Sequence, residues 1–319
     1  MRADLANGAL LALALAAATW SATLPGSPGR ATAAAPGGAA DAPGESATEV
    51  VDARGVAVPV APYGRIVSLS TISDHLLLRL VEPERLVSIT GYTRRDHPGA
   101  WRFGARPSID ASGQLEAVLG LRPDLVIVSK FADEAYMERI RERGIEVFDL
   151  GEMRGVETTR ANIRALGALL DVRERARELE RSYARDLQAL DDAVPDDRMA
   201  PGIYLSVYGD AFFGATARTS YADTLFYGGV RDIAAERGFA EWPQYSAEEL
   251  LGLDPPLIVT LRGMGEVLRS HAVLSRLRAC GPSGRIVEID GAYNADVGLG
   301  IVDAAQAVQD LVHGEEQDR

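Results

Sequence analysis

Aromatic and arginine side chains gather in segments that follow expected strands. The candidate set for ligand contact is Tyr92, Arg94, Trp101, Tyr208, Phe212, Arg218, Trp242 and Tyr293. Aromatic planes suit a large, flat and partly apolar ligand. Arg94, Arg218 and Arg262 could pair with carboxylate or phosphate groups on it. The alternative is that each aromatic ring packs against its own part of the fold.

Motifs for catalysis are missing from the sequence. It contains no G-x-S-x-G, Walker loop or H-E-x-x-H, and the G-x-G at Gly298 lacks its third glycine. The four histidines show no metal-pair spacing. His75 beside Asp74 and His97 beside Asp96 could touch a ligand or metal, but we expect loop or helix-start roles. We therefore predict no catalytic residue, no metal site and no resident cofactor.

Composition limits the classes of partner. The chain has 319 residues, which favours about two domains. A formal net charge of −13 disfavours binding to nucleic acid or anionic lipid. Cys280 is the single cysteine, so an internal disulfide or a thiolate cluster cannot form. We expect a monomer that binds a small molecule.

The first residues are typical of an export signal. Arg2 precedes a short apolar run from Ala9 to Ala18, and small residues follow. We predict a signal peptide at 1–22 and a disordered linker at 23–48, because that stretch is rich in Ala, Gly, Pro and Ser. An uncleaved anchor is the alternative. We expect a periplasmic protein, and no lipoprotein, since no cysteine lies near the N-terminus.

An internal repeat gives the strongest indication of the fold. Leu115–Val128 reads LEAVLGLRPDLVIV and Ala247–Thr260 reads AEELLGLDPPLIVT. Each copy predicts a short helix, a stop and a buried strand. Gly120 and Gly252 could supply a left-handed residue at the helix end.

The flanks of the repeat also match. RIVSLS and GIYLSV precede the two copies, while GIEVFDLG and GRIVEIDG follow them. Strands that alternate with helices predict parallel sheets covered by helices. We predict two Rossmann-like α/β lobes at 49–156 and 199–313, the first opening with a hairpin at Thr48–Pro59.

A helical segment separates the lobes. Apolar residues recur at helical spacing through 157–192. We predict one long, rigid interlobe helix, or two nearly continuous helices, and an αα-hairpin is the alternative.

Several segments resemble the substrate-binding proteins of ABC importers for cobalamin, ferric siderophores and haem. VVDARGVAVPVAPYGRIVSLS is similar to that family's hairpin-and-strand start, and LEAVLGLRPDLVIVS to its most recognisable segment. WPQYSAEELLGLDPPLIV resembles the matching stretch of its cobalamin-binding members. The resemblance covers roughly 50–312 and implies the class III periplasmic binding protein fold, with two lobes joined by one helix.

The resemblance also implies roles for single residues. Glu116 and Glu248 match carboxylates that dock each lobe on a dimeric membrane permease, although a glutamate also favours a helix N-terminus. Tyr92 and Trp242 match aromatic positions that contact cobalamin, and Tyr208 falls close to a third. The chain departs from the cobalamin-binding pattern at Asp110 or a neighbouring residue, where a second tryptophan is expected, and in the loop around Gly291.

These features favour an exported binding protein for a metal chelate, with a corrinoid such as cobalamin as the best candidate. A ferric siderophore or haem is the alternative ligand. An enzyme related to tetrapyrrole metal chelatases, or a scaffold that has lost transport, is the alternative of another class.

Overall fold

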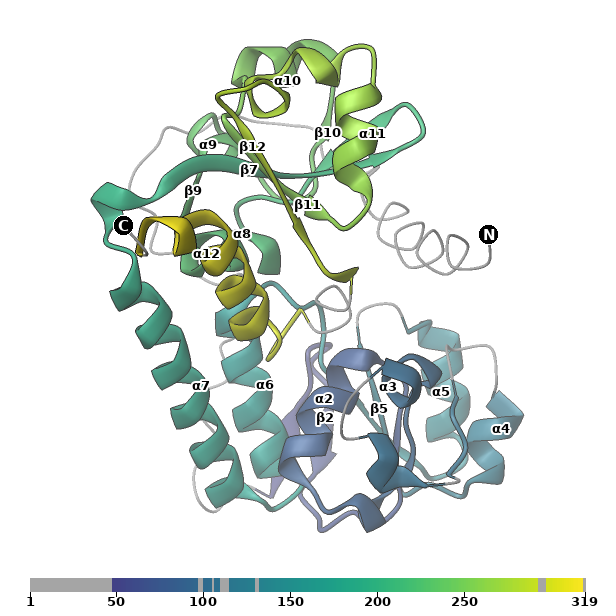
Figure 1. Ribbon diagram of the computed structural model, residues 1–319. Coiled ribbons are helices and arrows are strands. Elements are labelled where there is room, and N and C mark those ends of the chain that lie inside the picture. Colours follow the sequence, from purple (N-terminus) through teal and green to yellow (C-terminus); the bar gives the residue numbers. More distant parts are fainter. Residues whose placement is uncertain are drawn as a thin grey trace.

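The computed structural model describes residues 48–96, 100–104, 106–109, 115–129, 132–291 and 297–317. Figure 1 shows two α/β lobes, one above the other, with two long helices at one side. The predicted signal peptide and most of the predicted linker lie outside the described residues, as do His97, Asp110 and Tyr293.

The N-terminal lobe contains a four-stranded sheet in the order β4-β3-β5-β6, and all of its neighbouring strands are parallel. Its strands are β3 (Ile66–Ser68), β4 (Leu86–Ser88), β5 (Leu125–Val128) and β6 (Glu146–Asp149). Its helices are α2 (Thr71–Leu80), α3 (Gly91–Asp96), α4 (Leu115–Gly120) and α5 (Glu134–Arg141), with 3₁₀ turns η1 (Pro83–Arg85) and η2 (Ala100–Phe103). The predicted hairpin forms from β1 (Glu49–Val51) and β2 (Ala57–Pro59).

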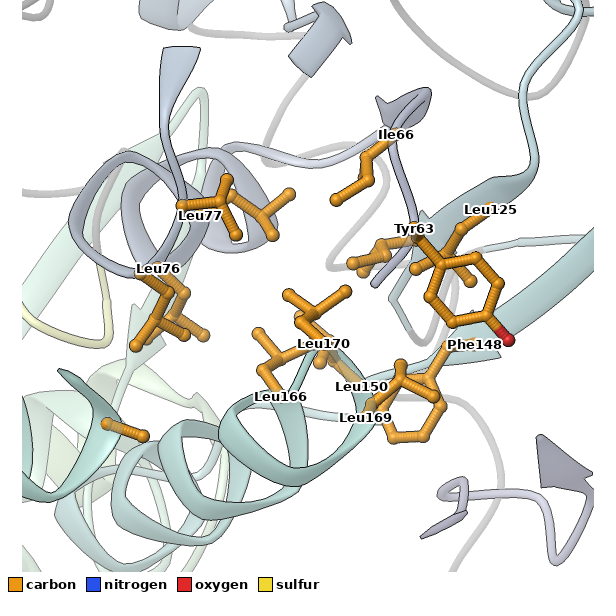
Figure 2. Packing of buried hydrophobic residues seen from close by; sticks show 14 of the residues in the cluster. Tyr63, Ile66, Leu76, Leu77, Leu125, Phe148, Leu150, Leu166, Leu169 and Leu170 are labelled. Carbon is orange, nitrogen blue, oxygen red and sulfur yellow. The ribbon is translucent and has the colours of Figure 1, made fainter. Parts of the chain in front are cut away.

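Both faces of this sheet are buried, because its strands are almost continuously apolar. On one face, Ile66 and Leu125 join a cluster with Leu76 and Leu77 of α2. Figure 2 shows Leu166 of the following helix, α6 (Val156–Leu169), packed toward these side chains. On the other face, the side chains of β3 and β5 that point the opposite way pack against α4 and α5. The sequence pattern thus produces a three-layer lobe.

The C-terminal lobe contains a six-stranded sheet that is only partly parallel. Its strands are β7 (Ala200–Tyr208), β8 (Ala211–Gly214), β9 (Val230–Asp232), β10 (Gln244–Tyr245), β11 (Leu257–Leu261) and β12 (Arg285–Ile289). β7, β9, β11 and β12 pair in parallel, whereas β8 is antiparallel to both β7 and β10. The prediction of parallel sheets is therefore correct for the first lobe and must be corrected for the second.

Helices also cover both faces of the second sheet. They are α8 (Ser220–Tyr227), α9 (Ile233–Glu236), α10 (Ala247–Leu253), α11 (Met264–Ser270) and α12 (Ile301–Gln317), with 3₁₀ turns η3 (Asp196–Arg198), η4 (Leu274–Arg276) and η5 (Arg278–Cys280). α10 and α11 supply side chains to one core cluster, and α8 and α12 to the other.

The segment between the lobes is an αα-hairpin and not one long helix. α6 has 14 residues and α7 (Arg173–Ala193) has 21, and they lie side by side in Figure 1. The chain reverses at Asp171, whose φ of 55° is left-handed. Reversal lets Leu166 and Leu170 join Ala176 and Leu179 in the core of the first lobe. α7, about 32 Å long by its helical rise, connects the two lobes.

The internal repeat is confirmed in three dimensions. α4–β5 and α10–β11 are its two copies, one in each lobe. The left-handed residues, however, are Arg122 (φ 48°) and Asp254 (φ 41°), and not Gly120 and Gly252. Each lies directly before a proline, which disfavours the right-handed helical conformation at that position. The repeat therefore preserves the backbone turn without using its glycines for it.

Candidate functional site

The candidate residues of the N-terminal lobe lie on α3 and η2, after the end of β4. The Tyr92 ring is half-buried, and the Arg95 guanidinium lies 5.1 Å from its centroid. Such a cation–π contact favours one orientation of the ring. In Figure 1, α3 lies on the side of this lobe that is nearer the other lobe.

Arg94 is used by its own lobe. Its Nε donates to Ser108 Oγ at 2.6 Å, its Nη1 donates to the Gly104 carbonyl at 2.6 Å, and its Nη2 donates to the Arg106 carbonyl. These bonds join α3 to the segment that follows η2. The Trp101 side chain is 80% exposed. The geometry thus favours a positioning role for Arg94, while Trp101 is accessible to a ligand.

A buried carboxylate lies below the start of α3. Asp74 of α2 is fully buried, and its Oδ2 accepts from the Thr90 N–H at 3.0 Å and from Thr90 Oγ1 at 2.6 Å. Burial raises the pKa of Asp74 to about 6, and the nearby hydroxyl groups of Ser68, Thr90 and Thr93 limit the rise. The expectation of a helix-start position is correct, but the carboxylate has no exposure to solvent.

Three aromatic rings stack in the C-terminal lobe. The Trp242 ring meets Tyr221 edge-on, with centroids 5.5 Å apart, and Tyr221 lies 4.3 Å from Tyr204. Burial raises the pKa of Tyr221 well above its ordinary value, so its hydroxyl stays neutral. Trp242 is the outermost ring, at 37% exposure. The stack supports an accessible indole, and Tyr221 is a supporting residue that sequence reasoning missed.

Tyr208 and Phe212 lie in strands β7 and β8, whereas the sequence placed Phe212 in a loop. The two residues flank a tight turn at Gly209 and Asp210. Phe212 is buried in the core of the lobe and meets His271 edge-on at 5.1 Å. Tyr208 is half-buried, and burial raises its pKa. Phe212 therefore packs within its own lobe, which is the alternative to ligand contact, while Tyr208 lies at the edge of the core.

An ion-pair group lies beside Trp242. Glu241 Oε1 is 3.4 Å from Arg218 Nη2 and 3.9 Å from Arg154 Nη1, and Arg154 belongs to the segment after β6. Arg262 is 3.4 Å from the carboxylate of Asp290. All these groups are substantially exposed, so the pairs contribute little to stability. Their guanidinium groups stay accessible to anionic groups of a ligand.

A second, half-buried carboxylate joins the lobes. Asp223 of α8 accepts the Val156 N–H at 2.6 Å, at the first turn of α6. Gly155, at φ 118°, leaves room for it, because a Cβ there would lie 2.0 Å from Asp223 Oδ2. Burial raises the pKa of Asp223 to about 6. This contact, with Tyr183 Oη donating to the Gly298 carbonyl at 3.1 Å, fixes α6 and α7 on the C-terminal lobe.

The predicted docking residues occupy equivalent places. Glu116 and Glu248 are the second residues of α4 and α10, and both are exposed. Glu249, not Glu248, makes the capping interaction with Ser246, so Glu248 is not needed for the helix start. The position of each glutamate is compatible with docking.

The structure brings Arg218 and Trp242 together around Glu241, and Tyr92, Arg94 and Trp101 together around α3 and η2. Ligand contact by these residues stays a prediction. A cavity of about 300 Å³ opens at the opposite end of the second sheet, beside Pro201 and Pro256. Within the described ranges, no group of three or more His, Cys, Asp or Glu side chains could hold a metal ion. No described helix is long and apolar enough to span a membrane.

Comparison with known proteins identifies a relative in sequence. A cobalamin-binding protein of Halobacterium salinarum is 25% identical over 198 residues, which is 61% of this chain and 53% of the relative. The chain thus spans about half the length of the curated relatives it matches.

Solved structures have the same fold. A possible iron-binding, periplasmic solute-binding protein from Staphylococcus epidermidis superimposes with a TM-score of 0.70 at 19% identity, covering 79% of this chain and 100% of the other. A periplasmic heme-binding protein from Pseudomonas aeruginosa gives a TM-score of 0.66 at 23% identity, covering 79% and 93%. The two-lobe α/β fold class with a helical connection is therefore confirmed.

The model of one family, described as "Periplasmic binding protein", matches residues 66–293. That range includes both sheets, both copies of the internal repeat and the αα-hairpin between them. This chain belongs to the periplasmic binding protein family.

Proposed function

We propose that this protein binds a metal chelate between its two lobes and delivers it to an ABC importer. The observation that carries the proposal is the Tyr204–Tyr221–Trp242 stack, which supports an accessible indole in a member of a binding-protein family. An indole held edge-on by a second ring is preorganised, so little conformational entropy is lost when it meets a flat ligand.

The best candidate ligand is cobalamin or a related corrinoid. The sequence relative in Halobacterium salinarum is a cobalamin-binding protein, which supports this choice. Haem and ferric siderophores are the alternatives, since structural neighbours are described as heme-binding or possibly iron-binding. Arg218 would pair with acidic groups of the ligand in exchange for Glu241, and Arg154 would do so in exchange for Glu152 and Glu241.

Glu116 and Glu248 would dock the loaded protein on the importer's permease dimer. One exposed carboxylate on each lobe can select an orientation through charge pairing with arginines, which affects specificity more than affinity. The role requires export, which the residues at 1–22 support by their composition. Membership in a binding-protein family favours this role over that of a chelatase-like enzyme.

A thermal-shift screen tests the ligand class. Purified protein is heated with cobalamin, cobinamide, haemin and ferric siderophores, and the true ligand raises the unfolding midpoint with concentration. A shift with a corrinoid alone supports the first candidate, and a shift with haemin alone supports the alternative.

The Trp242→Ala variant then tests the site. Loss of a stacked indole is expected to weaken binding about 10- to 100-fold. Phe226→Ala is the matched control, since Phe226 is an exposed ring on α8 that packs on Tyr227 instead. Equal affinity in Trp242→Ala and the wild type would contradict the assignment of the indole to the site.

A further inference from the structure

Asp74 is an unusual residue for the interior of a lobe, because one of its carboxylate oxygens has no partner. Its Oδ1 is buried without a hydrogen bond, whereas Oδ2 accepts twice from Thr90. A buried carboxylate left half-unsatisfied is costly to the fold, so its presence calls for a physical reason.

The two bonds to Thr90 give such a reason. Thr90 directly precedes α3, and its Oγ1 accepts from the Thr93 N–H at 3.3 Å as an N-cap residue does. The Thr90 and Thr93 hydroxyls also lie within 3.1 Å of each other. The carboxylate therefore fixes both the backbone and the side chain of the residue that starts α3.

α3 has only six residues, so it has little stability of its own. It is held from below by Asp74 through Thr90, and from its far side by Arg94, which joins it to the segment after η2. Tyr92 lies between these two attachments and Trp101 lies in η2. The positions of both aromatic side chains thus depend on Asp74 and Arg94.

We propose that Asp74 is a positioning residue for ligand binding, which holds the start of α3, and through it Tyr92, in the orientation that meets the ligand. This inference rests on the proposed function. It assigns to Asp74 no contact with the ligand, because the side chain is fully buried beneath α3.

The surroundings of Asp74 make its ionisation a specific marker of this role. Its pKa, about 6, is set by burial and by the hydroxyl and peptide groups of Ser68, Thr90 and Thr93. The other titratable or charged side chains described on the two helices are His75 and Arg79 on α2 and Arg94 and Arg95 on α3. α6 and α7 pack on α2 through apolar side chains, and their Arg175 bonds to the Leu80 carbonyl at the far end of α2.

The first test measures α3 without a ligand. Hydrogen exchange of the peptide that spans Thr90–Asp96 is followed by mass spectrometry at pH 7.5 in the full chain. Asp74→Ala removes both acceptors, so exchange should rise about tenfold. Asp52→Asn is the matched control, because Asp52 is a buried carboxylate of the same lobe that instead accepts the Arg54 and Val56 N–H groups of the β1–β2 turn. Unchanged exchange of α3 in Asp74→Ala would overturn the proposal.

The second test measures affinity against pH with cobalamin and haemin as probes. Asp74→Asn keeps an oxygen for the Thr90 N–H but no charge, so it should bind the probe about threefold more weakly than the wild type at pH 7.5. At pH 5 the wild-type carboxyl is protonated, and the two proteins should bind equally. Comparing the two proteins at each pH cancels any titration of the probe itself.

The outcomes separate this inference from the proposed function. A ratio of affinities that does not change between pH 5 and pH 7.5 would overturn the positioning role even if Asp74→Asn binds weakly. Failure of the wild type to bind any chelate would contradict the proposed function, and the exchange of α3 in Asp74→Ala would still decide whether Asp74 holds this helix.

Discussion

In the N-terminal lobe the candidate ligand segment is held by hydrogen bonds, whereas in the C-terminal lobe it is held by packed rings. α3 and η2 depend on Asp74 and Arg94, which bind to backbone and hydroxyl groups. Trp242 depends on Tyr221 and Tyr204, which contact it and one another through their rings. The hydrogen-bonded segment should therefore be sensitive to the charge of its side chains and to pH. The ring stack should be sensitive to the volume of its side chains. The two lobes share one repeat, yet they hold their candidate ligand segments in place by different interactions.

The largest effect is expected in the ring stack. Tyr221→Ala removes the central ring of the three, and loss of a large buried ring should lower the free energy of unfolding by about 3–5 kcal/mol in urea denaturation. Tyr221→Phe is the control that keeps the ring, and it should cost much less. Equal losses in the two variants would show that the hydroxyl, and not the ring packing, stabilises this lobe.

Arg94→Lys tests the hydrogen-bonded segment. A lysine has one nitrogen and cannot reproduce three bonds from a planar guanidinium. Loss of two bonds at about 1 kcal/mol each predicts a decrease of about 2 kcal/mol in the free energy of unfolding. The fluorescence anisotropy of Trp101 should also fall, and Arg79→Lys on the exposed face of α2 should change neither quantity.

The stability of the N-terminal lobe should depend on pH through Asp74. The pKa of Asp74 is about 6 in the folded protein, whereas the ordinary value of 3.8 applies to the unfolded chain. The native state therefore binds the proton more tightly than the unfolded state does. The stability from this group is present at low pH and is lost as the pH rises through 6. Between pH 5 and pH 7.5 the contribution of Asp74 alone to this loss should be about 1.4 kcal/mol.

Asp74→Asn should abolish that contribution and leave the one from Asp223, whose pKa is also about 6. Urea denaturation at the two pH values measures the difference. An identical pH dependence in Asp74→Asn and the wild type would show that Asp74 does not titrate in this range.

The smallest effect on stability is expected at the docking glutamates. The double variant Glu116→Lys, Glu248→Lys changes two exposed side chains, so the free energy of unfolding should change by less than about 0.5 kcal/mol. Ligand affinity should also stay constant, while uptake through the importer should fall. A parallel loss of affinity would place these residues in the ligand site.

The sequence predicted most of the fold because the repeat carries its own physical signals. Leu125–Val128 and Leu257–Val259 are continuous apolar runs that follow a proline, and both lie in buried strands. The hairpin between α6 and α7 was not favoured, since helical spacing continues through Leu169 and Leu170 and the turn uses Asp171 without a glycine or proline. Gly209 and Asp210 predict a loop through Phe213, whereas in the structure they form a tight turn and β8 begins directly after it.

The candidate site was predicted less completely. Residue type alone selects Trp242 and Arg218 as candidates for ligand contact, which stays a prediction. It selects neither Glu241 nor Tyr221, because contacts between distant residues leave no local pattern. Asp74 and Asp223 stand in the first turns of α2 and α8, where carboxylates are common on exposed surfaces. Only the packing of other elements over these positions reveals that Asp74 is buried and Asp223 half-buried.

The αα-hairpin has a consequence for the speed of ligand exchange. The chain passes between the lobes three times: after β6 toward Asp223, back along α6, and again along α7. A rotation that separates the lobes must bend all three segments together. Each bent segment adds to the activation barrier for opening, so the barrier is higher than it would be with a single linker. We expect the ligand to enter and leave by local rearrangement of α3, η2 and the Trp242 segment, which makes the residence time a property of those loops.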